Sequence, residues 1–247
     1  MAEALRSRKE VIDKWGQDTV RLFQTDAKPD TLVNRSLITA LSVSSAYSTA
    51  IMTLLANELR LPAKALLRVI FELSAKLLWC LKVSDCDQAR DEQCVEEKMA
   101  RWAKDSLQNE KKLRTDLLMH VQPEIQATIR KQIDGLDLAI NSLNTADGMP
   151  KFKKVLEQLG PSWDELFRVR LYADFNNTVH LDIVSLCSLV QDNGTKLTIG
   201  FDSAEPISHL AQCCAVIMHN IFWAIRTKYE WETQTMDEDF RQSNREA

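Results

Sequence analysis

Residues 66–79, LLRVIFELSAKLLW, form the most apolar run in the chain, yet this run contains Arg68, Glu72 and Lys76. Residues four apart lie on one face of an α-helix, drifting by about 40° per step. Together with Lys64 one turn earlier, these charges therefore form one stripe on an otherwise apolar helix, which we call the polar seam. A helix that is apolar on nearly all sides belongs inside a bundle. Charges there must be paired or must line a site, because an isolated buried ion is costly.

Two interpretations of the polar seam stay open at the level of the sequence. In the first, Arg68 and Glu72 form an intrahelical ion pair at a partly exposed edge, and Lys64 and Lys76 extend their ammonium groups to water. In the second, Arg68 and Glu72 line a functional site.

A second amphipathic segment, FRVRLYADFNNTVHLDIV, carries a matching polar stripe. Arg168, Tyr172, Asn176 and His180 again follow one another at intervals of four residues on a predicted helix from Ser162 to about residue 190. Each of these side chains needs hydrogen-bond partners if it is buried. If the two stripes face each other, Glu72 would orient the imidazole of His180 or raise its pKa, and one pocket would hold both.

Composition favours a helical protein. The chain has 247 residues, of which 45% are hydrophobic, and only 6 Gly and 6 Pro. Its formal net charge of −4 argues against an overall electrostatic grip on nucleic acid. The six cysteines form no C-x-x-C pair, and the charged N-terminus lacks an apolar signal region, so we expect reduced thiols, no membrane span and a cytoplasmic location.

The pattern along the chain predicts one all-α domain covering residues 1–247, a bundle of about seven helices. Residues 1–83 and 151–232 would form its core, and the charge-rich residues 85–145 a long protruding helical hairpin. Residues 191–206 alternate around an Asn-Gly turn signal and predict a short strand-like loop. The polar tail, residues 236–247, is expected to be frayed.

Several chemistries lack support in the sequence. It contains no P-loop, no G-x-G-x-x-G, no G-x-S-x-G and no H-E-x-x-H motif. His209 and Cys213 have the spacing of two metal ligands, but no second cluster completes a tetrahedral set. We therefore expect neither a metal nor another cofactor.

The two stripes resemble motifs of a bacterial all-helical family known only as a domain of unknown function. That pattern is R-x3-E on an apolar helix, followed about a hundred residues later by Y-x3-S-x2-VH. Arg68, Glu72, Tyr172 and His180 match it, and Asn176 stands where serine is expected. The resemblance spans roughly residues 36–231 and implies a helical fold without supplying an activity.

A more distant similarity is to HEPN domains, helical bundles that include metal-independent ribonucleases of toxin and phage-defence systems. Their signature is often R-N-x3-H; Asn176 and His180 match it, whereas Phe175 replaces the arginine. The resemblance implies His180 as general acid and base and an arginine as the clamp on the charged transition state. With Phe175 in that position, Arg68, Arg168 or Arg170 would have to supply the guanidinium.

Two functions follow as hypotheses. The first is an HEPN-like effector that binds or cleaves RNA, in which Tyr172, Asn176 and Glu72 position His180 and Arg68, while Arg168, Lys64 and Lys76 contribute to binding. The second is a non-catalytic interaction or scaffold module with a buried polar network, recruiting a protein partner or a second copy as a homodimer through residues 85–145.

Overall fold

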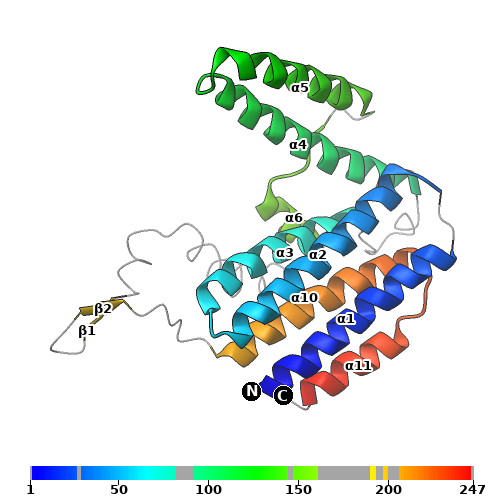
Figure 1. The fold of residues 1–247 in the computed structure, drawn as a ribbon. Coiled ribbons are helices and arrows are strands. Elements are labelled where there is room, and N and C mark those ends of the chain that lie inside the picture. Colours follow the sequence, from blue (N-terminus) through cyan, green and yellow to red (C-terminus); the bar gives the residue numbers. More distant parts are fainter. Residues whose placement is uncertain are drawn as a thin grey trace. The chain divides into compact units, whose positions relative to one another are not determined.

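A computed structural model describes residues 2–26, 29–81, 92–143, 147–160, 190–192, 197–199 and 206–245. The expected all-α fold is confirmed, and the described residues form eight α-helices. The chain divides into two compact units (Figure 1). The larger contains residues 1–30, 34–82 and 152–247, and the smaller contains residues 31–33 and 83–151.

The larger unit is a helical bundle. It contains α1 (Ala2–Thr25), α2 (Leu32–Ala56), α3 (Arg60–Leu81), α6 (Phe152–Leu159), α10 (Ile207–Lys228) and α11 (Gln234–Arg245). The helices α3 and α10 pack along each other, α1 packs on α10, and α11 packs on both α1 and α10 (Figure 1). Helices far apart in the sequence therefore share one core.

The centre of this core is built by α3 and α10. Leu67, Ile70, Phe71 and Leu77 of α3 are fully buried, as are Leu210, Ile217, Met218, Ile221, Phe222 and Ile225 of α10. Short helix α6 closes one side of α3, where Phe152 packs edge-on against Phe71 with ring centroids 6.0 Å apart. The indole N–H of Trp79 donates to Gln158 Oε1 of α6 at 2.7 Å.

Helices α1 and α2 approach each other at Gly16. A Cβ atom at this position would lie 3.4 Å from Ser45 Oγ of α2 and 3.6 Å from Phe222 of α10. These are ordinary van der Waals distances, so α1 lies close to both neighbours at this glycine. The buried stripe of α2 recurs every three or four residues and includes Leu37, Leu41, Ser44, Ser48, Ile51 and Leu55.

Helix α2 has a further property. Among the described residues, it is the one helix that is long and apolar enough to cross a membrane when only length and composition are considered. Because the core helix of a soluble bundle meets the same two criteria, this finding by itself assigns no location to α2.

The smaller unit is a helical hairpin of α4 (Glu92–Leu118) and α5 (Pro123–Ser142). Pro123 occupies the first turn of α5, where its missing N–H leaves no bond unmade. Lys111 of α4 forms an ion pair with Asp137 of α5 at 2.6 Å, and Arg114 of α4 donates to Gln132 of α5. Polar side chains therefore join α4 to α5 along the hairpin.

Two short strands confirm the strand-like character predicted near residue 191. Strand β1 (Val190–Asp192) pairs antiparallel with β2 (Leu197–Ile199), and Gln191 lies opposite Thr198. The predicted helix from residue 162 and the rest of the predicted loop lie outside the described residues.

The prediction of a frayed tail at residues 236–247 is wrong for the residues described. Gln234–Arg245 form helix α11, and Met236 is only 1% exposed. Met236, Phe240 and Ser243 recur at intervals of three or four residues, and Phe240 packs on Trp15 with ring centroids 6.2 Å apart. This narrow inward-facing stripe was hidden by the polar composition of the tail.

Helices α2 and α10 both end in a left-handed residue that is not glycine. Glu58 and Glu230 each have φ of 60°. After α2, the N–H of Leu59 bonds to the carbonyl of Leu54 at 2.8 Å, and that of Glu58 bonds to Leu55 at 3.1 Å. This is the Schellman arrangement, in which glycine is the favoured left-handed residue.

Replacing Glu58 with glycine should therefore stabilise the protein. The left-handed conformation costs a residue with a Cβ about 1 kcal/mol, so Glu58→Gly should raise the free energy of unfolding by about 0.5–1 kcal/mol. Urea unfolding followed by circular dichroism measures the change. The neighbouring control Ala56→Gly lies in helical backbone and should lower stability; a loss of stability in Glu58→Gly would contradict this account.

Candidate functional site

The polar seam lies on α3 as its spacing predicts. Arg68 Nε donates to Glu72 Oε1 at 3.1 Å, one helical turn further along. Their side chains are 16% and 29% exposed, so the pair lies at a largely covered edge of the helix. Because water screens it only partly, this pair interacts more strongly than an exposed surface pair of the same geometry.

The two lysines of the seam differ in burial. Lys64 is 8% exposed and therefore buried, whereas Lys76 is half-buried. The low exposure of Lys64 gives no support to the first interpretation, in which both lysines extend to water, whereas the apolar Val69 of the same helix is 43% exposed. Both observations have one cause: the open face of α3 lies over Pro62 and Val69, about a third of a turn away from the stripe through Lys64 and Arg68.

Two cations of the polar seam, Lys64 and Arg68, are largely shielded from solvent. Glu72 accepts from the Nε of Arg68, which fixes the plane of the guanidinium and leaves the directions of its two terminal nitrogens defined. A guanidinium held in this way is suited to a planar or tetrahedral oxyanion, such as a carboxylate or phosphate. The seam could also serve as a structural ion pair, and its geometry alone fits both roles.

The partner stripe lies outside the described residues. Arg168, Tyr172, Asn176 and His180 all belong to residues 161–189, of which the structure gives no description. Of the residues predicted to form the site, Arg68, Glu72, Lys64 and Lys76 are therefore placed. The predicted meeting of Arg68 and Glu72 with His180 stays a prediction.

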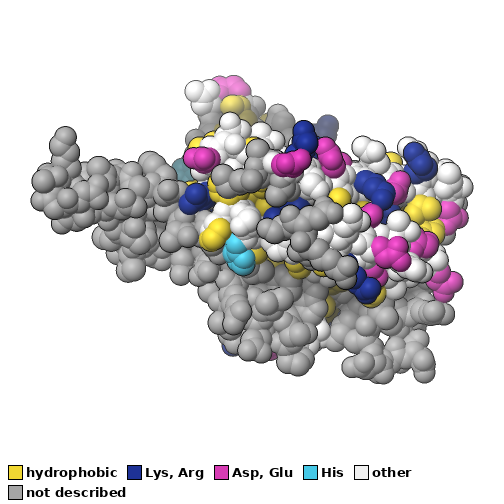
Figure 2. Space-filling model, turned by 90° about the horizontal axis from the view of Figure 1, so that it is seen from below, with side chains coloured by type: hydrophobic (Ala, Val, Ile, Leu, Met, Phe, Trp, Pro, Cys, Tyr) yellow, Lys and Arg dark blue, Asp and Glu magenta, His cyan; other side chains and the backbone are white. Residues whose placement is uncertain are grey.

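Several basic residues elsewhere in the described chain form ion pairs with acids. In the hairpin, Arg101 pairs with Glu97 at 2.6 Å, and Arg114 pairs with Glu110 at 2.7 Å. Figure 2 likewise shows acidic and basic side chains interspersed on one face of the molecule. The described surface thus gives little support for nucleic-acid binding by a basic patch.

His219 contributes a buried polar contact that the sequence did not indicate. Its Nε2 lies 2.8 Å from Asp237 Oδ1 of α11, and its ring stacks on Phe240 at 4.4 Å and meets the edge of Trp15 at 5.6 Å. Burial lowers the pKa of His219, and the hydrogen bond and charge of Asp237 oppose that shift only in part. His219 is thus an uncharged side chain that links α10 to α11 through its hydrogen bond with Asp237.

The other cysteine and histidine candidates on α10 offer a weak pair. His209 Nε2 lies 3.7 Å from Cys213 Sγ, and no group of three metal-ligating side chains occurs within the described ranges. Burial, with a smaller contribution from Cys213, raises the pKa of the neighbouring Cys214 thiol. Cys214 therefore stays protonated as a core residue.

Arg226 is a buried cation with a structural role. It is 5% exposed, and its Nε donates to Thr19 Oγ1 of α1 at 3.1 Å while its Nη1 donates to the carbonyl of Glu232 at 3.2 Å. Burial lowers its pKa, and the carboxylates of Asp18, Glu232 and Asp239 counteract this effect. Arg226 thereby joins α1 to the turn between α10 and α11.

The fold and the seam define a class: an all-α protein whose central helix carries a partly buried arginine–glutamate pair. A family model described as a family of unknown function, DUF5677, matches residues 36–197, and the chain belongs to that family. The match begins within α2 and covers α3, the hairpin and the predicted histidine helix. No curated protein and no solved structure matches the chain.

The His219–Asp237 contact predicts a pH dependence of stability. Because the folded pKa of His219 lies below its unfolded value of about 6.5, the unfolded state binds the proton more readily. The contribution of His219 is complete above about pH 6.5 and decreases as the pH falls toward the folded pKa. His219→Gln should therefore flatten the dependence of unfolding free energy on pH between about 7.5 and 5.5.

The variant Asp237→Asn provides the opposite test in the same urea titrations. It removes the carboxylate that raises the pKa of His219, so the loss of stability on acidification should become steeper. Unchanged pH profiles in both variants would show that His219 does not titrate as this contact requires.

Proposed function

We propose that this chain is an HEPN-like helical effector that binds or cleaves RNA at the polar seam of α3, without a metal ion. The observation that carries the proposal is the pair of covered cations: Lys64 is 8% exposed, and the side chain of Arg68 is 16% exposed. The proposed setting is a bacterial toxin or phage-defence system in the cytoplasm.

The low exposure of these cations supports a role at a phosphate. A cation in a partly dry site interacts with a developing negative charge more strongly than one in water, because the local dielectric is lower. Glu72 accepts one hydrogen bond of Arg68 and leaves the terminal nitrogens of the guanidinium oriented. Arg68 would thus supply the guanidinium that the HEPN signature places where Phe175 stands in this chain.

The remaining roles follow from residue chemistry. His180 would accept a proton from the attacking hydroxyl and return one to the leaving oxygen, which suits an imidazole near neutral pH. Tyr172, Asn176 and Glu72 would hold His180 and Arg68 in position, and Arg168, Lys64 and Lys76 would contact the RNA backbone. The lower exposure of Arg68, at 16% against 28% for Arg101 and 32% for Arg114, supports a site on α3 rather than on the hairpin.

The proposal predicts that Arg68 and His180 are needed for the same activity. Arg68→Ala and His180→Ala should each reduce cleavage of single-stranded RNA at least a hundredfold, because each removes a group acting in the transition state. Cleavage is measured on labelled oligonucleotides in the presence of EDTA. The matched control is Arg35→Ala, whose ion pair with Asp30 is exposed.

Circular dichroism and thermal melts of the same variants separate a site from a structural pair. The proposal requires that His180→Ala and Arg68→Ala keep the helical spectrum while activity is lost. Variants that cleave or bind RNA as the wild type does, but melt at much lower temperature, would assign the seam a purely structural role.

The exposed apolar residues of the hairpin favour a second candidate, a non-catalytic interaction module. Five large apolar residues of α4, α5 and their connection are between 48% and 78% exposed: Leu113, Leu117, Met119, Ile125 and Leu138. Apolar side chains gathered on one solvated element commonly mark a protein-binding surface. In this candidate the hairpin recruits a protein partner and the seam only stabilises the bundle.

Substitutions at the end of the hairpin distinguish the two candidates. If recruitment is the function, Leu113→Glu with Leu117→Glu should abolish the cellular phenotype, such as growth arrest or phage protection, because the glutamates disrupt apolar contacts. The same phenotype should persist in His180→Ala. The reverse pattern, with His180→Ala inactive and the hairpin variant active, would exclude the interaction module as the primary function.

A further inference from the structure

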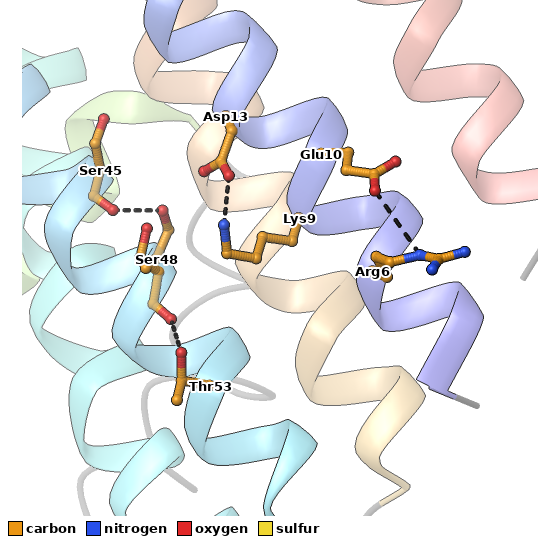
Figure 3. A network of polar contacts seen from close by, with 8 residues as sticks. Arg6, Lys9, Glu10, Asp13, Ser45, Ser48 and Thr53 are labelled. Carbon is orange, nitrogen blue, oxygen red and sulfur yellow. Dashed lines mark hydrogen bonds and ion pairs between the residues drawn. The ribbon is translucent and has the colours of Figure 1, made fainter.

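An open groove runs between α1 and α2, away from the polar seam. Its volume is about 480 Å³, and it is lined by one face of α1 from Ile12 to Gln24 and by Ser45 and Ser48 of α2. Figure 3 shows this region, with Asp13 on α1 paired to Lys9, and Ser45 and Ser48 on the facing helix. Gly16 and the two serines are small, which explains why a furrow opens here.

The α2 side of the groove carries no charge. Residues 36–57 contain no Asp, Glu, Lys, Arg or His, although many of them face solvent. Ile38 is 46% exposed, and Ser42, Ser45 and Thr49 follow it on the same face at intervals of four, three and four residues. Val20, on the α1 side, is 41% exposed. Such a surface favours association, because covering it requires no charged group to lose its water.

The α1 side of the groove has a charge pattern that is complementary to itself. Asp13, Gln17 and Arg21 are an acid, an amide and a base at successive intervals of four residues. Gln17 and Arg21 are exposed, and Asp13 is half-exposed. Asp13 lies four residues before Gln17 and Arg21 lies four residues after it, so opposite charges stand at equal distances on either side of Gln17.

We propose that this face is a two-fold symmetric interface with a second copy of the chain, in which the two α1 helices cross antiparallel at Gln17. A two-fold axis brings residues equally spaced on either side of Gln17 together, so Asp13 of each copy meets Arg21 of its partner. The same symmetry brings Glu10 toward Gln24 of the partner, and each charge pair occurs twice. The uncharged α2 faces then cover the exposed Val20 and Ile38.

Charge complementarity selects a second copy over other occupants. A lipid surface would cover the uncharged α2 face but leave the alternating acid and base of α1 without a role. In the dimer, the carboxylate of Asp13 lies between Lys9 of its own helix and Arg21 of the partner. Charged pairs of this kind set register and partner choice at an interface more than they set total affinity.

A charge swap tests the interface. Sedimentation velocity from about 1 to 100 μM should show a concentration-dependent dimer for the wild type. Arg21→Asp and Asp13→Arg should each raise the dimer dissociation constant about tenfold or more. Each substitution replaces both attractive pairs of the interface by pairs of like charge. The double variant Asp13→Arg with Arg21→Asp restores opposite charges and should recover most of the affinity.

A control variant and a lipid assay complete the test. Lys153→Asp makes the same charge change on α6, at a side chain that is 71% exposed and outside the groove, and should leave the dimer unchanged. A wild type that stays monomeric at 100 μM, or a double variant no better than the single ones, would overturn the proposal. Flotation of a monomeric wild type with neutral phosphatidylcholine vesicles would assign the α2 face to lipid instead.

Discussion

Burial of α3 is the constraint on which the rest of the structure depends. This helix is apolar around most of its circumference, so it can be stable in water only when other helices surround it. Helix α10 covers one side of α3, and α6 covers another through Phe152 and Gln158. The same burial forces the charges of α3 into a narrow stripe, where Arg68 and Glu72 neutralise each other at 3.1 Å.

Polar contacts elsewhere hold the bundle together around this centre. Arg226 joins α1 to the turn after α10, and His219 joins α10 to α11 while its ring packs on Trp15 and Phe240. Each contact is partly or fully buried and has a defined partner, so each contributes to the choice of one arrangement among several packings of apolar helices. The Arg68–Glu72 pair differs from these contacts because its two members lie one turn apart on the same helix.

The fold was largely predictable because helical periodicity and the scarcity of Gly and Pro are local signals. The apolar run of α3, the start of α5 at Pro123 and the strand character around Gln191 follow directly from such signals. The helical tail was missed, because its apolar contacts come from other helices: Phe240 packs on Trp15, more than two hundred positions away, and on His219 of α10. The His219–Asp237 contact joins α10 to α11 over 18 positions, and no periodic pattern within either helix indicates it. For the site, spacing predicted the Arg68–Glu72 pair. It did not predict which other residues of α3 face solvent, since that depends on the helices packed against α3.

The central claim is that Arg68 and His180 act in one site. A double-mutant cycle on RNA cleavage tests it most directly, using Arg68→Ala, His180→Ala and both together, with Arg35→Ala replacing Arg68→Ala in a parallel cycle. Groups that act together in one transition state are strongly non-additive, so the double variant should be hardly worse than either single variant. Losses that simply multiply, as expected for Arg35 and His180, would show that Arg68 and His180 act independently and would contradict the claim.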